Sequence, residues 1–132
     1  MKLVSIYDEA ESVQILYRLL SERTPDQSIS HKGMPHFEDH YDFVHSKPYN
    51  AWYLIKYKGD YVGSIYLTKL RELGIFIFNE YQHRGIATKA IHLIQTLHPG
   101  RMLANVNPNN TPSMEMFKKM GNLIQVTFTL DS

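Results

Sequence analysis

Residues 75 to 91 of the chain are Ile75-Phe76-Ile77-Phe78-Asn79-Glu80-Tyr81-Gln82-His83-Arg84-Gly85-Ile86-Ala87-Thr88-Lys89-Ala90-Ile91, and they predict a strand, a tight turn and a helix. The run from Ile75 to Phe78 is apolar and β-prone, which is typical of a strand buried on both faces. From Ile86 the apolar residues recur at helical spacing until Pro99-Gly100. The small residues of the turn let a ligand approach the first N–H groups of the helix, which have no internal partner. The stretch therefore predicts an anion-binding turn.

A second motif follows about 25 residues later, where an alternating α/β chain is expected to place its next crossover. It is Asn107-Pro108-Asn109-Asn110-Thr111-Pro112-Ser113-Met114-Glu115-Met116-Phe117-Lys118-Lys119-Met120-Gly121. It is similar to the pattern Asn-x-x-Ser/Ala-x-x-x-Tyr/Phe-x-Lys-x-Gly-Phe of the GNAT superfamily of acyl-CoA-dependent N-acyltransferases. The turn Gln82-His83-Arg84-Gly85-Ile86-Ala87 resembles the pyrophosphate signature of the same family, Gln/Arg-x-x-Gly-x-Gly/Ala. Two motifs in the right order and spacing make the resemblance specific.

The resemblance implies an α/β (α+β) fold in one domain over residues 1–132, with a mixed, mostly antiparallel central sheet flanked by about four helices. The residue patterns predict strands at 2–6, 51–57, 61–69, 75–78, 101–106 and 123–130. They predict helices after Asp8, at about 37–45, at 86–97 and from about 111 to 120. One strand remains after the final helix where family members often have two, so closure of the sheet and dimer formation there are open.

Composition narrows the possible functions. The chain has 132 residues, of which 43% are hydrophobic and 20% charged, as in a single globular domain. Lys and Arg number 14 against 13 Asp and Glu, so a concentrated basic face for nucleic acid is not expected. The sequence contains no Cys, which excludes disulfides and a cysteine nucleophile within it. No apolar run reaches membrane-spanning length, and we expect a cytoplasmic protein without membrane partners.

The resemblance also implies that acetyl-CoA (coenzyme A) is the acyl donor. The turn is expected to hold its pyrophosphate through Gln82, His83, Arg84, Gly85, Ile86, Ala87 and the Thr88 hydroxyl. The main chain of Ile75 and Ile77 is expected to pair with the pantetheine arm like an added strand. Asn110, Ser113 and Phe117 occupy motif positions that line the same cleft. From the residues alone, Asn110 is a turn residue and Ser113 a helix-start residue.

Transfer to an amine requires a group that accepts its proton. Glu72 lies near the basic Glu of some family members, although Arg71 fits that position about as well and a solvated strand-end role is the alternative. His31 is a second catalytic candidate, because the His-rich segment 30–40 matches the acceptor side of the family's cleft. His31, His40 and Asn105 are the predicted substrate contacts.

The same histidines raise the question of a metal. His36 and His40 have helical i,i+4 spacing, but the string is His-x-Glu-x-His and not the His-Glu-x-x-His of zinc proteases. No metal site is therefore predicted.

The chain departs from the family at Phe117, where many members have a Tyr that protonates the departing thiolate. A phenyl ring donates no proton, but a thiol of pKa about 8.5 leaves acceptably as a thiolate. Tyr66 or water is an alternative donor. Asn122 stands where the family usually has Phe after the glycine.

We therefore expect an N-acetyltransferase that moves an acetyl group directly from acetyl-CoA to a primary amine of a small molecule. The general likeness points to amino sugars as one class of acceptor. A peptide or protein N-acetyltransferase is the alternative within the same chemistry. A non-catalytic acyl-CoA-binding module is the alternative outside it, and Phe117 is its best support. Both a monomer and a homodimer are compatible with the sequence.

Overall fold

The computed structural model describes residues 1–23 and 34–131 of the chain. Within these residues the elements follow the order β1 (Lys2–Ser5), α1 (Ser12–Ser21), α2 (Phe37–His45), β2 (Ala51–Tyr57), β3 (Asp60–Leu67), β4 (Glu72–Ile77), α3 (Ile86–Leu97), β5 (Leu103–Ala104) and α4 (Thr111–Met120). Short 3-10 helices, η1 (Ile6–Asp8) and η3 (Asn79–Tyr81), follow β1 and β4. The helices described here are all too short or too polar to cross a membrane.

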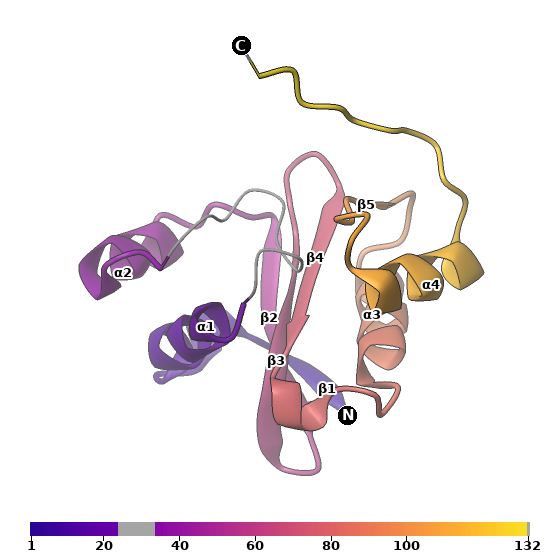
Figure 1. Cartoon of the computed structure of the whole chain (residues 1–132). Coiled ribbons are helices and arrows are strands. Elements are labelled where there is room, and N and C mark those ends of the chain that lie inside the picture. Colours follow the sequence, from indigo (N-terminus) through magenta and orange to yellow (C-terminus); the bar gives the residue numbers. More distant parts are fainter. Residues whose placement is uncertain (24–33, 132) are drawn as a thin grey trace.

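The strands form one sheet in the order β1-β2-β3-β4-β5. All neighbours are antiparallel except β4 and β5, which are parallel. Helices α1 and α2 cover one face of the sheet, and α3 and α4 cover the other (Figure 1). Leu16 and Phe78 belong to the core under α1, and Ile65 and Ile94 to the core under α3. The predicted mixed sheet with about four helices is thus confirmed, because each apolar sheet face is buried by amphipathic helices.

The predicted hairpin joins β2 to β3 through Lys58 and Gly59. Both residues have left-handed backbones, with φ of 51° and 87°. Two consecutive left-handed residues are typical of the type I′ turn, whose twist matches that of the strands it connects.

β4 has an open edge beyond its short pairing with β5. β4 pairs with β5 over its first two residues only, whereas it pairs with β3 along most of its length. The N–H of Phe78 donates to the carbonyl of Val62 at 2.9 Å. Along an antiparallel pair, the residues that hydrogen-bond to the partner strand alternate with residues whose N–H and C=O groups point the other way. Since Phe78 bonds to β3, Ile75 and Ile77 direct their N–H and C=O groups away from β3. These groups face the gap that opens where β5 ends.

Three strand predictions need correction. Residues 123–130 form no strand and extend away from the body of the protein (Figure 1). Their apolar side chains are exposed, with Phe128 82% and Leu130 94% accessible. An alternating pattern alone does not make a strand, because a strand also needs a neighbouring edge to accept its hydrogen bonds. The predicted strand 101–106 is limited to Leu103–Ala104, because the chain pairs with β4 at these two residues only and then separates from it.

The third correction concerns burial. The run from Ile75 to Phe78 is not buried throughout, since every residue of β4 is only half-buried. Ile75 packs on the α3 side and Phe76 on the α1 side, but the open edge leaves both partly accessible.

Candidate active site

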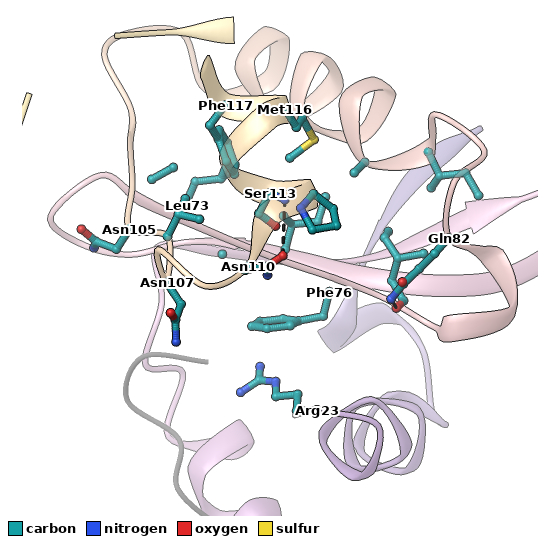
Figure 2. A pocket seen from close by; sticks show the side chains of 18 of the residues that line it. Arg23, Leu73, Phe76, Gln82, Asn105, Asn107, Asn110, Ser113, Met116 and Phe117 are labelled. Atoms are coloured by element: carbon teal, nitrogen blue, oxygen red, sulfur yellow. Dashed lines mark hydrogen bonds between the residues drawn. The ribbon is translucent and has the colours of Figure 1, made fainter. Parts of the chain in front are cut away.

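A cavity of about 720 Å³ opens where β4 and β5 separate. Its walls come from the end of α1, from β3 and β4, from the turn before α3, from residues 104–107 and from the start of α4 (Figure 2). This volume is in the range of small-molecule sites. Most of the residues selected from the sequence converge here: Glu72, Ile75, Ile77, Gln82, His83, Gly85, Ile86, Ala87, Thr88, Asn105, Asn110, Ser113 and Phe117.

The turn before α3 has a backbone that presents N–H groups. His83 and Gly85 are left-handed, with φ of 64° and 74°, and a Cβ built on Gly85 would have no atom within 4 Å. The first bond of α3 runs from the N–H of Lys89 to the Gly85 carbonyl at 3.3 Å. The N–H groups of residues 86–88 precede it and have no partner inside the helix. The turn therefore offers donors and the positive end of the helix dipole to the cavity.

Gln82 ties this turn to the end of β4. Its Nε2 donates to the carbonyl of Ile77 and to Oδ1 of Asn79, each at 3.2 Å. The Ile77 carbonyl can accept this bond because it lies on the edge that turns away from β3. The predicted anion turn and the open edge of β4 are thus one continuous surface.

Residues of α4 approach the cavity from the opposite side. Asn110 caps α4, and its Oδ1 accepts a hydrogen bond from the N–H of Ser113 at 3.3 Å (Figure 2). The helix-start role that the residues alone suggest therefore coexists with their position in the cavity wall. Phe117 lies one turn further along and packs with Met116 against the core under α3.

Glu72 lies in the cavity wall beside β5. Nδ2 of Asn105 donates a short hydrogen bond to its Oε2. Arg71, the alternative at this register, faces elsewhere, since its guanidinium donates to the carbonyls of Arg101 at 3.0 Å and His98 at 2.9 Å. Of these two residues only Glu72 lines the cavity. A carboxylate in this position is chemically able to accept a proton from an amine.

Two predicted site residues do not reach the cavity. Nη2 of Arg84 donates to the carbonyl of Glu80 at 3.1 Å, and its guanidinium lies over the ring of Tyr81. His40 is buried in the interface between α1 and α2, with Nε2 3.0 Å from the carbonyl of Val13. Burial lowers the pKa of His40, so the ring is neutral there.

One predicted residue cannot be placed in this way. His31 lies outside the described residues.

Arg23 and Tyr66 line the cavity although no sequence motif selects them. The guanidinium of Arg23 lies 3.5 Å from the ring centroid of Phe76. Tyr66, named above as an alternative proton donor, stacks on Tyr49 with centroids 3.9 Å apart. Its ring passes over Gly74, where a Cβ would lie 2.1 Å from the Tyr66 Cζ. In the sequence Arg23 looks like any positive residue after a helix, so only the structure brings it to the site.

The acetyltransferase (GNAT) family model matches residues 13–121, which include the turn, β4 and α4. The chain belongs to the GNAT family. It is accordingly an acyltransferase, and family members use acetyl-CoA as acyl donor. No curated protein sequence matches this GNAT chain.

Solved structures with the same fold are distant in sequence from this GNAT protein. One is a chimera of the spermidine N-acetyltransferase SpeG from Vibrio cholerae and hSSAT, with 13% identity, a TM-score of 0.72, and coverage of 96% of this chain and 84% of that one. Another is a ribosomal-protein-alanine N-acetyltransferase from Brucella melitensis, with 16% identity, a TM-score of 0.66 and coverage of 91% and 82%. A possible acetyltransferase from Clostridium difficile has 12% identity, a TM-score of 0.65 and coverage of 99% and 95%. At such identities these likenesses show the fold alone.

Proposed function

We propose that this GNAT protein transfers an acetyl group from acetyl-CoA directly to the primary amine of a small molecule, with amino sugars as one class of acceptor. One observation carries the proposal: the anion-binding turn at Gly85, the open edge of β4 and Glu72 all line a single cavity. A donor site and a proton acceptor in the same space suit direct transfer. The absence of Cys from the sequence supports it as well, because an acyl-cysteine intermediate cannot form.

The residues present fit acetyl-CoA, which supplies the acetyl group as a thioester. The open space at Gly85 and the free N–H groups of residues 86–88 suit a pyrophosphate. The outward N–H and C=O groups of Ile75 and Ile77 suit the amide-bearing pantetheine arm. Asn110 and Ser113 would line the same arm from α4.

Glu72 would accept the proton that the attacking amine must lose. The amine nitrogen forms a bond to the acetyl carbon as the carbon–sulfur bond breaks, one amine proton passes to Glu72 directly or through water, and sulfur leaves as a thiolate. Phe117 cannot protonate that thiolate, and Tyr66, which lines the cavity, or water would be the alternative donor.

The fold alone does not identify the acceptor amine. The structural neighbours are named for spermidine and for ribosomal-protein alanine, which are different kinds of amine. The volume of about 720 Å³ supports a small acceptor, because the same cavity must also admit the thioester end of the donor.

Thiol release from acetyl-CoA, followed with a thiol-reactive dye, tests this proposal. The protein contributes no background because it has no Cys. We expect release with a small-molecule pool drawn from amino sugars, nucleotide-linked amino sugars, polyamines or amino acids. Release with basic peptides alone would contradict a small-molecule acceptor. No thiol release with any pool, while acetyl-CoA still binds, would favour a non-catalytic acyl-CoA-binding module.

The Gly85→Glu variant tests the donor site separately. It adds a side chain and a negative charge at the turn, so the affinity for acetyl-CoA should fall by about tenfold or more, or about 1.4 kcal/mol. Gly59→Glu is the matched control, because Gly59 is also left-handed (φ +87°) and open but lies in the β2–β3 turn outside the cavity. Equal acetyl-CoA affinity in both variants, measured by calorimetry, would overturn this donor site.

A further inference from the structure

The cavity contains a cation that the proposed transfer does not use. Arg23 follows α1, and its guanidinium lies beside the ring of Phe76 (Figure 2). Its Nε is buried and has no hydrogen-bond partner among the described residues. Burial lowers the pKa of Arg23, but a guanidinium keeps its proton at neutral pH. This part of the cavity therefore carries a positive charge.

The carboxylates of the cavity wall are engaged elsewhere. Oε1 of Glu22 accepts a hydrogen bond from the N–H of Asn79 at 2.7 Å. Oε2 of Glu72 accepts one from Asn105. In the described part of the chain neither carboxylate forms an ion pair with Arg23. A partly buried charge without a counter-ion among the described residues is unfavourable, so this site is suited to a bound anion.

Among the described residues, aromatic rings and not carboxylates interact with the guanidinium. The Phe76 ring face stabilises the cation, though less than an ionic partner would. Tyr66 and Tyr49 are the neighbours whose charge would act on Arg23. Burial, and then the adjacent Tyr66 hydroxyl, raise the pKa of Tyr49, so this hydroxyl is neutral and supplies no counter-charge.

The position of Arg23 separates it from the proposed donor site. Arg23 approaches from the α1 side of β4, whereas Asn110, Ser113 and Phe117 approach from the α4 side (Figure 2). The residues proposed to hold acetyl-CoA are on the α3 and α4 side. The α1 side is left for the acceptor.

We propose that Arg23 binds an anionic group, a carboxylate or a phosphate, on the acceptor, so that the acceptor is a small amine that also carries negative charge. This inference rests on the proposed function. A planar guanidinium can donate two parallel hydrogen bonds to either oxyanion, and contact with Phe76 limits its freedom before binding. The same charge disfavours polyamine acceptors.

Matched pairs of acceptors test the proposal by thiol release. Glucosamine 6-phosphate is compared with glucosamine, and alanine with alaninamide, while spermidine serves as the cationic arm. We expect kcat/KM to be about 10- to 100-fold higher for the anionic member of at least one pair, as is typical of charge-assisted hydrogen bonds. The phosphate and carboxylate arms show which anion is bound. Equal rates within both pairs, or a preference for spermidine, would overturn the proposal.

Substitution of the arginine provides the second test. Arg23→Gln should remove the preference for the anionic member and leave the affinity for acetyl-CoA unchanged. Arg23→Lys should keep part of the preference. Arg18→Gln is the matched control, because Arg18 is an exposed arginine of α1 that lies 4.8 Å over Phe78 outside the cavity. A preference that survives in Arg23→Gln would show that another group binds the anion. Ratios within one variant are insensitive to its overall stability.

Calorimetry separates this inference from the proposed function. If no amine releases thiol, but glucosamine 6-phosphate or alanine binds the wild type and not Arg23→Gln, the anion site stands and the transfer activity does not. If thiol is released but binding of neither anionic acceptor depends on Arg23, the transfer activity is supported and the anion site is overturned.

Discussion

At the residue scale, the position of Glu72 is determined by two neighbours. Its N–H donates to Oγ1 of Thr68 at 3.0 Å, and its carbonyl accepts from the N–H of Thr68 at 2.9 Å. Asn105 then orients the carboxylate from the segment after β5. Main chain and side chain are thus held separately, which is the preorganisation that a general base requires.

Glu72→Gln should lower kcat by about 100-fold or more at neutral pH, because an amide cannot accept the proton of the amine. The loss should shrink as pH rises, since a larger share of the acceptor is already neutral. Steady-state thiol release against pH checks both statements. Glu38→Gln, on the exposed side of α2, is the control. Equal kcat in the two variants would mean that water or another group takes the proton.

At the element scale, the packing of α2 on α1 depends on a neutral histidine. His40 is 4% exposed, contacts the rings of Tyr17 and Phe37, and lies 3.0 Å from the Val13 carbonyl. A neutral ring with its proton on Nε2 can donate to that carbonyl. Because Arg23 follows α1 directly, this interface also supports the cavity wall.

The lowered pKa of His40 predicts a pH dependence of stability. Above the unfolded value of about 6.5 both states hold a neutral ring. Below it the unfolded chain binds a proton that the folded chain does not. The free energy of unfolding therefore decreases as the pH is lowered, by at most about 1.4 kcal/mol per pH unit, until the pH passes the folded pKa. His40→Gln should remove this component. Urea unfolding of the wild type and His40→Gln between pH 8 and pH 5 measures this component. Parallel plots of the free energy of unfolding against pH would contradict the prediction. His92→Gln, exposed on α3, is the control.

At the scale of the whole molecule, the tail after α4 is the unusual feature. Leu123, Ile124, Val126, Phe128 and Leu130 are 62% to 94% exposed, and residues 121–130 contain no charge. An uncharged, extended, apolar segment is a ready partner for a free sheet edge. The outer edge of β5 is such an edge.

We expect this tail to pair with the β5 edge of a second copy and so to produce a homodimer. The 132-residue chain should show a monomer–dimer equilibrium in sedimentation velocity, and the double substitution Val126→Lys and Phe128→Lys should shift it to monomer. Lys2→Arg, on the exposed start of β1, is the control. A monomer whose tail amides are protected from hydrogen exchange would show pairing within one chain instead.

Patterns over short distances were predictable from the sequence. The turn at Gly85, the hairpin at Lys58-Gly59 and the helices at 37–45 and 86–97 agree with the structure. Each depends on residues a few positions apart, such as a left-handed glycine or apolar side chains at helical spacing. The two motifs likewise predicted the family, since both lie within continuous stretches of chain.

Only the tertiary structure decided which side chains share the cavity. Arg84 and Arg23 are both arginines after structured elements, yet Arg84 bonds to Glu80 of the preceding 3-10 helix while Arg23 lies against Phe76 in the cavity. His40 is turned inward by the packing of α2 on α1. The tail has the alternation of a strand but pairs with no edge of the sheet in the described residues. Such outcomes depend on contacts between residues far apart in the chain, and the packing of helices on a sheet determines those contacts.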